Sequence, residues 1–312
     1  MNTKRFLLAM GAIFMLSLPM SAFNWDVTGD GEVTVADVTA VYKRLLNNDA
    51  TYPESSYDVN GDGNITSSDI TEIYKVLLNG FPVETTEYTV NGVTFVMVKV
   101  QGGTFTMGAN ADDNVASDNE KPAHQVTVSS FAIGQTEVTQ ELWQAVMGYN
   151  YSGNVGDKNP VEFVNWNMCM MFISKLNQMT GQNFRLPTEA EWEFAARGGN
   201  KSKNYLYSGS DNIDEVAWYD GNSNGTSQNV ASKAPNELGI YDMCGNVWEW
   251  CSDWFGDYSA NAQTDPTGPE SGTTKVLRGG SWYSTAVKCR NSKRFKYEPD
   301  KYDDDIGFRL AM

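Results

Sequence analysis

Histidine is almost absent from this sequence, since His124 is the only one among 312 residues. One histidine excludes an iron site held by several histidines of a single chain. No nucleophile-elbow motif accompanies it, which argues against a Ser-His-Asp hydrolase. Basic residues are also few, with 23 Lys and Arg against 39 Asp and Glu and a net charge of −16. This balance argues against nucleic acid and anionic membranes as partners.

Long apolar runs are missing except at the start of the chain. Residues 6–19 are apolar, follow a basic start and precede the small residues Ser21 and Ala22. This arrangement is typical of a secretory signal peptide, here residues 1–22. No cysteine follows the run, which argues against a lipoprotein anchor, and no second run reaches membrane length. We therefore expect a secreted protein, extracellular or periplasmic, without membrane insertion.

Cysteine is scarce as well, and the chain has only four: Cys169, Cys244, Cys251 and Cys289. In an oxidising compartment four cysteines can form two disulfides, with three possible connectivities. We favour a Cys169–Cys289 bridge, and buried free thiols are the alternative.

What the sequence does contain is a twelve-residue loop that occurs twice, from Asp26 to Asp37 and again 32 residues later. Oxygen-bearing side chains fall at alternate positions and at position 12, with Gly at position 6. A hard cation collects oxygens in this spacing, so we predict one Ca²⁺ in each loop. The alternative is a pair of metal-free turns. The predicted ligands are Asp26, Thr28, Asp30, Glu32 and Asp37, then Asp58, Asn60, Asp62, Asn64 and Asp69.

An apolar pattern at helical spacing follows each loop, and Tyr42 matches Tyr74 at the same offset. Each unit is therefore a loop plus a helix. Residues 24–80 resemble the type I dockerin module, which docks bacterial enzymes and binding proteins onto cohesin partners. The resemblance implies a small all-α module with two bound Ca²⁺ ions and a cohesin-like partner.

After a polar linker at residues 81–89 the chain changes character. Short alternating strands and three helices are expected, with Thr188 capping the third helix and Glu191 closing its capping box. About a hundred residues rich in Gly, Asn, Ser and Trp follow, with little periodicity. The expected class for residues 90–312 is α+β. The helices are predicted over Thr139–Met147, Asn167–Gln178 and Glu189–Arg197.

Four ordered motifs give this second part its family resemblance. They are Gly102-Gly-Thr-Phe-Thr-Met-Gly108, Arg185-Leu-Pro-Thr-Glu-Ala-Glu-Trp-Glu193, Gly245-Asn-Val-Trp-Glu-Trp250, and Arg278-Gly-Gly-Ser-Trp282 with Gly307-Phe-Arg309. Residues 90–312 thereby resemble the formylglycine-generating enzyme family, also called sulfatase-modifying factors. The resemblance implies a modified C-type-lectin-like fold with little regular secondary structure. We expect Trp192, Trp248 and Trp250 to belong to its core.

The enzymes of this family oxidise a substrate cysteine to formylglycine with two cysteines that hold copper(I), a soft ion suited to thiolates. The motif register places Ser284 at the first cysteine position and Cys289 at the second. If the loop is shorter, Cys289 is structural and neither position is filled. We therefore expect a non-catalytic binding domain without copper. The alternative is an oxidase that converts a sulfatase cysteine to formylglycine, with Cys289 as its catalytic residue.

The resemblance also implies a third calcium site, formed by Asp242, the carbonyls of Gly245 and Val247, and Glu249. Glu249 could instead pair with an arginine in the core.

Tyr and polar residues are dense between Trp282 and Ile306, as in binding surfaces on rigid scaffolds. Relatives of this fold display ligand-binding residues in this region. We expect an unidentified protein or carbohydrate ligand here, and an ordinary solvated loop is the alternative. The predicted ligand-binding residues are Tyr283, Ser284, Asn291, Tyr297 and Tyr302.

Overall fold

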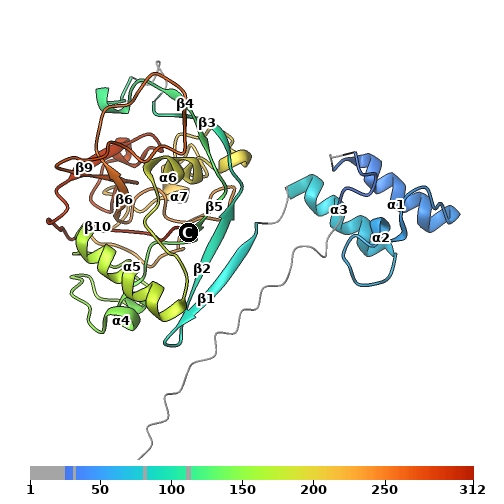
Figure 1. Cartoon of the computed structure of the whole chain (residues 1–312), viewed down its shortest axis with the longest axis horizontal. Coiled ribbons are helices and arrows are strands. Elements are labelled where there is room, and N and C mark those ends of the chain that lie inside the picture. Colours follow the sequence, from blue (N-terminus) through green and yellow to red (C-terminus); the bar gives the residue numbers. More distant parts are fainter. Residues whose placement is uncertain (1–24, 31–32, 80–82, 110–113) are drawn as a thin grey trace, which may run out of the picture. The chain divides into compact units, whose positions relative to one another are not determined.

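The structure, a computed structural model, describes residues 25–30, 33–79, 83–109 and 114–312 (Figure 1). The chain forms two compact units that meet in the sequence between Glu84 and Thr85. The predicted signal peptide, residues 1–22, lies outside the described residues, as does Glu32 of the first loop. Among the helices that the structure describes, none is long and apolar enough to cross a membrane.

The N-terminal unit is all-α, with helices α1 (Val35–Asn47), α2 (Glu54–Tyr57) and α3 (Ser67–Asn79). Helix α1 begins at Thr34, whose hydroxyl accepts a hydrogen bond from the Ala36 amide at 3.1 Å. The two loop-helix repeats bury matched residues, since Val41 and Ile73 are both fully buried. The core of this unit contains Trp25, Val27, Val38, Ala40, Val41, Tyr57, Val59, Ile70, Ile73 and Val76.

The C-terminal unit contains three small sheets, which confirms the α+β class (Figure 1). The first is antiparallel, with the order β1 (Thr85–Val90), β2 (Val93–Val100), β5 (Phe131–Gly134). The second has the order β10 (Ile306–Gly307), β6 (Trp248–Trp254), β8 (Lys275–Arg278), β9 (Arg294–Tyr297). The third has the order β3 (Gly103–Met107), β4 (His124–Val128), β7 (Gln263–Thr264).

Strand β1 begins inside the segment predicted as a linker. The whole of β1 pairs with β2, from Thr85 opposite Val98 to Val90 opposite Val93. The aromatic ring of Tyr88 packs against that of Phe184 at a centroid distance of 5.1 Å. Residues 85–89 therefore belong to the C-terminal unit, because their side chains find partners there.

The three predicted helices are confirmed, with small shifts at their ends. Helix α4 is Gln140–Met147, α5 is Trp166–Thr180 and α6 is Glu189–Ala196, and a one-turn helix α7 covers Ile213–Val216. Thr139 caps α4, and Thr188 with Glu191 forms the expected capping box of α6. Short 3₁₀ turns cover Asp118–Glu120, Gly199–Lys201 and Ala286–Cys289. Long segments between these elements are irregular, as the resemblance implied.

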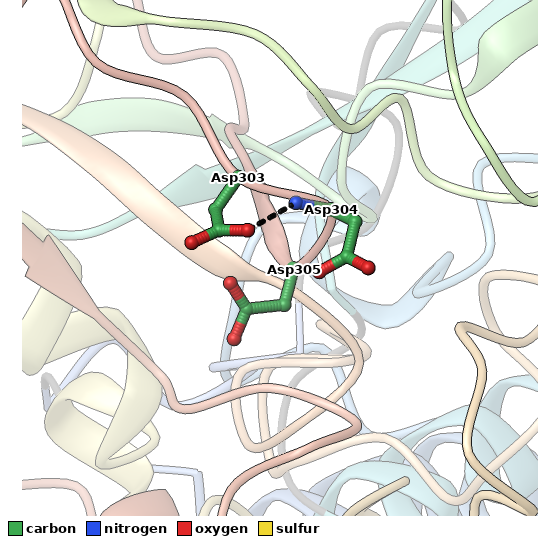
Figure 2. Close-up of side chains that lie close together, drawn as sticks. All are labelled: Asp303, Asp304 and Asp305. Atoms are coloured by element: carbon green, nitrogen blue, oxygen red, sulfur yellow. Dashed lines mark hydrogen bonds between the residues drawn. The ribbon is translucent and has the colours of Figure 1, made fainter.

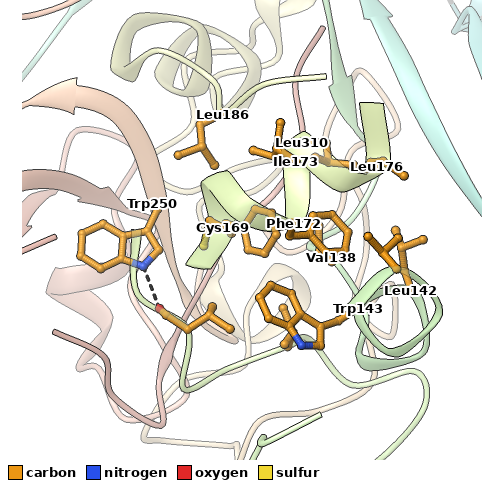
Figure 3. Packing of buried hydrophobic residues seen from close by; sticks show 14 of the residues in the cluster. Val138, Leu142, Trp143, Cys169, Phe172, Ile173, Leu176, Leu186, Trp250 and Leu310 are labelled. Carbon is orange, nitrogen blue, oxygen red and sulfur yellow. Dashed lines mark hydrogen bonds between the residues drawn. The ribbon is translucent and has the colours of Figure 1, made fainter. Parts of the chain in front are cut away.

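The core gathers aromatic side chains from α4, α5, β6 and the C-terminal segment (Figure 3). Trp143 stacks on Phe172 at a centroid distance of 5.2 Å, and the Phe308 ring meets both edge-on. The Trp250 indole donates to the Val164 carbonyl at 3.0 Å. Trp192, Trp248 and Trp250 are buried, which confirms their expected place in the core.

Buried arginines of the C-terminal unit pair with glutamates, and two of these pairs join family motifs. The pairs are Arg278 with Glu193, Arg290 with Glu120, Arg294 with Glu189, and Arg309 with Glu249. The guanidinium of Arg294 donates hydrogen bonds to both carboxylate oxygens of Glu189, at 2.6 and 2.7 Å. Because a charge buried without a partner is costly, the pairs of Arg278 with Glu193 and of Arg309 with Glu249 fix how the motif segments meet.

Candidate functional site

The two N-terminal loops have nearly the same hydrogen-bonding pattern around their first residue. Asp26 accepts from the amides of Gly29 and Asp30 at 2.7 and 3.2 Å. Asp58 accepts from the amides of Asp62 and Gly63 at 3.1 and 2.9 Å. These bonds curl each loop around its own carboxylates, as a calcium loop requires.

The carboxylate at position 12 closes each loop and also starts the following helix. Asp37 accepts from the amides of Thr28 and Thr34 at 3.0 and 2.7 Å. In the second loop Asp69 accepts from the equivalent amides of Asn60 and Thr66 at 3.2 and 2.7 Å. Both carboxylates are fully buried. Loop closure and helix initiation therefore depend on the same side chain.

Position 3 distinguishes the two loops. The Thr28 hydroxyl donates to Asp37 at 3.1 Å, whereas the Asn60 side-chain oxygen accepts from the Asp62 amide at 3.0 Å. Asn64 donates its amide to Asp62 at 2.8 Å, and this hydrogen bond lowers the pKa of that carboxyl. The donor set consists of hard oxygens in both loops, so the residues present fit Ca²⁺.

A second group of carboxylates lies inside the C-terminal unit. Both oxygens of Glu249 accept from Arg309 at 2.6 Å, and one also accepts from the Trp192 indole at 2.7 Å. The pairing of Glu249 with a core arginine, raised as an alternative, is therefore present. Asp242 accepts from the Ala231 amide at 2.7 Å.

Glu137 completes this group, and sequence reasoning missed it. Its carboxylate accepts from the Asn246 side chain at 2.7 Å and the Val247 amide at 3.1 Å. Burial and the charges of Asp242 and Glu249 raise its pKa well above the ordinary value. Burial likewise raises the pKa of Asp242 to about 6. No motif contains Glu137, so only its long-range contact reveals it.

The four cysteines are free and buried, so the predicted Cys169–Cys289 bridge is wrong and the free-thiol alternative holds. Cys169 lies in α5 within the aromatic core, whereas Cys289 packs with Cys244 and Tyr207 in a separate cluster. The two predicted partners therefore belong to different parts of the interior.

Cys289 has a structural environment. A Cβ on Gly280 would lie 2.7 Å from its sulfur, so the thiol packs against backbone. It is fully buried, and burial raises its pKa well above the ordinary value. The next residue, Arg290, is also buried and contacts Glu120 at 2.9 Å. A reactive thiol needs access and a lowered pKa, and Cys289 has neither.

A cavity of about 330 Å³ opens at the C-terminal stretch. Tyr283, Ser284 and Tyr297 line it, as three of the five predicted ligand-binding residues. Tyr283 is 74% exposed, whereas Ser284 is buried and its hydroxyl contacts that of Ser281. Sequence reasoning missed Trp248, which lines the cavity from β6 outside the predicted stretch. Lys288 and Asp305 also line it and lie within the stretch, but were not among the predicted ligand-binding residues.

The remaining two predicted residues lie elsewhere. Asn291 is buried and donates to the Tyr205 carbonyl at 3.1 Å, so it stabilises the interior and does not face a ligand. Tyr302 is exposed, with its ring 6.1 Å from that of Phe163, and it does not line the cavity. The Trp282 indole, at the start of the stretch, is half-buried and donates to the Asp304 carbonyl at 3.3 Å.

Three consecutive aspartates, Asp303, Asp304 and Asp305, lie beside this cavity, and the first and third line it (Figure 2). The Ser281 hydroxyl donates to Asp305 at 2.7 Å, while burial raises the pKa of that carboxyl. The cavity thus combines aromatic faces with an acidic edge and two lysines, Lys288 and Lys293.

Comparisons with known families and proteins agree with this fold and with the order of the two units. Residues 85–312 match the model of the "Sulfatase-modifying factor enzyme 1-like domain", and residues 24–78 match the "Dockerin type I domain". The chain is 34% identical over 266 residues to "Chaperone protein LppX" of Paenibacillus barcinonensis, covering 69% of this chain and 88% of that protein. It is 29% identical to the formylglycine-generating enzyme of Streptomyces coelicolor, with the same coverage.

Solved structures give the same picture. "Treponema denticola variable protein 1" has a TM-score of 0.68 and 35% identity, covering 74% of this chain and 99% of that one. PvdO from Pseudomonas aeruginosa has a TM-score of 0.60 and 29% identity, covering 69% of this chain and 93% of that one. The chain therefore belongs to the sulfatase-modifying factor family through residues 85–312, and it carries a type I dockerin domain in front of that region.

Proposed function

We propose that this protein is a secreted, calcium-dependent binding protein that docks through its N-terminal unit and captures a ligand through its C-terminal unit without catalysis. The dockerin domain implies Ca²⁺ binding and a cohesin partner in general. The finer assignments are two Ca²⁺ ions in the loops from Asp26 and Asp58 and a ligand in the cavity beside Tyr283.

Exposed apolar residues on α1 and α3 support docking. Tyr42 and Tyr74, at equivalent positions of the two repeats, are 47% and 42% exposed, and Leu46 is 76% exposed. A unit this small that leaves such side chains in solvent has a surface suited to a protein partner. We therefore place the cohesin-like contact on these two helices.

The buried carboxylate group supports a third Ca²⁺ site in the C-terminal unit. Glu137, Asp242 and Glu249 offer three carboxyl groups, which carry three negative charges when all are ionised, while Arg309 supplies one positive charge. A bound cation would offset this surplus, and the carbonyls of Gly245 and Val247 would complete a hard oxygen shell. Calorimetry on the full chain tests this site. We expect Asp242→Asn to lose the third Ca²⁺ and to keep the two in the N-terminal loops.

Burial of Cys289 is the observation that carries the non-catalytic assignment. The formylglycine chemistry of the family requires two accessible thiolates, and here one position holds Ser284 and the other a thiol with a raised pKa. Such a pair cannot hold copper(I), because neither group supplies an exposed soft ligand.

Incubation with copper(I) and a Cys-x-Pro-x-Arg peptide tests this assignment. We expect no aldehyde in the peptide by mass spectrometry. We also expect no alkylation of Cys289 in the native protein, although all four thiols react after unfolding. Aldehyde formation together with native alkylation of Cys289 would establish the oxidase instead.

The ligand cavity is tested by comparing tyrosines inside and outside it. Screening against an array of extracellular proteins and glycans should identify a ligand whose capture is lost in Tyr283→Ala and Tyr297→Ala. Tyr302→Ala is the matched control, because Tyr302 is exposed and does not line the cavity. If all three variants lose ligand capture equally, the cavity is not the binding site.

A further inference from the structure

A second cavity of about 280 Å³ lies in the C-terminal unit, and none of the predicted ligand-binding residues lines it. Its walls come from the ends of β3, β4 and β6, the start of α6, and the loop of residues 256–269. The sole histidine, His124, lines it together with Asp253, Trp254 and Tyr258. Its volume suits a small molecule of several non-hydrogen atoms.

One ion pair in the wall of this cavity, between Arg294 and Glu189, is fully hydrogen-bonded. Arg294 contacts both oxygens of Glu189, and its remaining nitrogen donates to the carbonyls of Asn119 and Gly256. The Tyr258 hydroxyl also donates to Glu189, at 3.2 Å. These groups satisfy one another, so they form a wall and leave no charge for a ligand.

Asp253 differs from Glu189 because only one of its two carboxylate oxygens accepts hydrogen bonds within the described residues. Its Oδ2 accepts from the Glu189 amide at 3.0 Å and from the Ser252 hydroxyl at 2.9 Å. Within the described residues, no hydrogen bond reaches Oδ1. The neighbouring Lys275 donates to the Ser252 carbonyl at 2.7 Å and lies against the Trp254 ring, so its ammonium is engaged.

His124 presents a second acceptor without a donor. Its Nδ1 lies 3.1 Å from the Pro122 carbonyl, which can only accept, so Nδ1 carries the proton. In the neutral ring Nε2 then has a free lone pair. That atom is buried and has no hydrogen-bond partner among the described residues, and the side chain is only 4% exposed. A buried acceptor left unsatisfied is costly and points to a missing donor.

We propose that this cavity binds a small primary ammonium compound, whose N–H groups donate to Asp253 and to Nε2 of His124. The site offers two acceptors, and when Asp253 is ionised it also offers a negative charge, so it suits a cationic donor and repels an anion. A metal fits this cavity less well. Within the described residues, the side chains close enough together to hold a metal ion are Asp303, Asp304 and Asp305, and none of them lines this cavity. The ring of Tyr258 lies 4.9 Å from that of His124 and adds an aromatic wall, although the Arg294 guanidinium already lies 3.8 Å from its centroid.

The test uses 1-butylammonium chloride as probe and 1-butanol as its neutral counterpart, on the full chain with saturating Ca²⁺. The chain has one histidine, so the imidazole nitrogens of an untagged protein give a single unambiguous set of NMR signals. We expect a saturable shift of the Nε2 signal with the ammonium and none with the alcohol. An equal response to butanol would show a neutral site and overturn the proposal.

Asp253→Asn keeps the shape of the side chain and removes its charge. We expect it to weaken ammonium binding by about tenfold or more, as for a lost charged hydrogen bond. Asp257→Asn is the matched control, since Asp257 lines the same cavity but is exposed. The proposal fails if Asp253→Asn binds as tightly as the parent, or if the control loses as much affinity. The shift of His124 in the unaltered chain decides the question should the Asn variant not fold.

Discussion

The two units of this molecule bury carboxylates in different ways. In the N-terminal unit Asp37 and Asp69 are fully buried, and within the described residues they accept hydrogen bonds only from amides and a hydroxyl. In the C-terminal unit buried glutamates such as Glu189 and Glu193 face buried arginines. We therefore expect the N-terminal unit to need a cation from solution, whereas Glu189 and Glu193 of the C-terminal unit have arginine partners within the chain.

This difference separates the conditions on which each unit depends. Amides alone do not balance several carboxylates in one small loop, so the fold of the N-terminal unit is linked to Ca²⁺ concentration. Guanidinium–carboxylate pairs are part of the chain, so the C-terminal unit keeps them when free Ca²⁺ is removed. The two units should therefore respond to different perturbations.

Removal of Ca²⁺ should produce the largest effect and should act on the N-terminal unit. Chelation should unfold residues 24–80, whose core is too small to fold without metal, and leave most of residues 85–312 folded. Eight of the nine tryptophans lie in the C-terminal unit, so indole fluorescence follows it selectively. Helical circular dichroism should fall only by the share of α1, α2 and α3, because α4, α5 and α6 belong to the C-terminal unit and should keep their signal.

Asp30→Ala with Asp62→Ala gives the corresponding genetic test. This double variant should lose the same circular dichroism signal at saturating Ca²⁺, because each loop loses a ligand. If the chelated protein keeps its full helical signal, the dependence on Ca²⁺ is disproved.

Breaking an internal pair should have the next largest effect and should act on the C-terminal unit. Arg309→Met leaves Glu249 buried without its partner and should reduce the free energy of unfolding by about 3–5 kcal/mol. Urea unfolding followed by tryptophan fluorescence measures it. Lys158→Met is the control, since its pair with Glu141 is exposed and should be worth less than about 1 kcal/mol. Similar losses in both variants would contradict the role given to the buried pairs.

Sequence reasoning succeeded where the signal is local. The cap at Thr188 and the helix that follows each N-terminal loop lie within a few residues of the signals that predict them, so spacing alone is enough. The same holds for the division of the chain into two regions of different character.

Contacts between distant segments were not predictable from one sequence. Glu137 joins Asp242 only in the folded chain, and the opposite walls of the Tyr283 cavity come from separate strands. Polar residues in the irregular C-terminal stretch have no periodicity to separate inward from outward positions. Asn291 was therefore taken for a ligand contact although it is buried.

Asp253 offers a pH test of a carboxylate that has no arginine partner. Burial raises its pKa to about 7, so the folded protein holds this proton more tightly than the unfolded chain does. Its contribution to stability is complete below about pH 4 and is lost as the pH rises through about 7, a change of about 2–4 kcal/mol. Asp253→Asn should lack this loss, so its stability relative to the parent should rise between pH 4 and 8. Parallel pH profiles of the two proteins, followed by indole fluorescence, would refute the raised pKa.

The smallest expected effect distinguishes the two calcium loops from each other. Loop two should bind Ca²⁺ more tightly, because Asn60 can supply a carbonyl oxygen where Thr28 supplies a hydroxyl that donates to Asp37 at 3.1 Å. Thr28→Asn should therefore raise the affinity of loop one by about two- to tenfold, or about 0.4–1.4 kcal/mol. Calorimetric titration of the metal-free chain resolves the two loops, and Asn60→Thr should produce the opposite change in loop two. If Thr28→Asn leaves both affinities unchanged, position 3 does not set the difference and the hydrogen bonds to Asp37 and Asp69 become the next candidates.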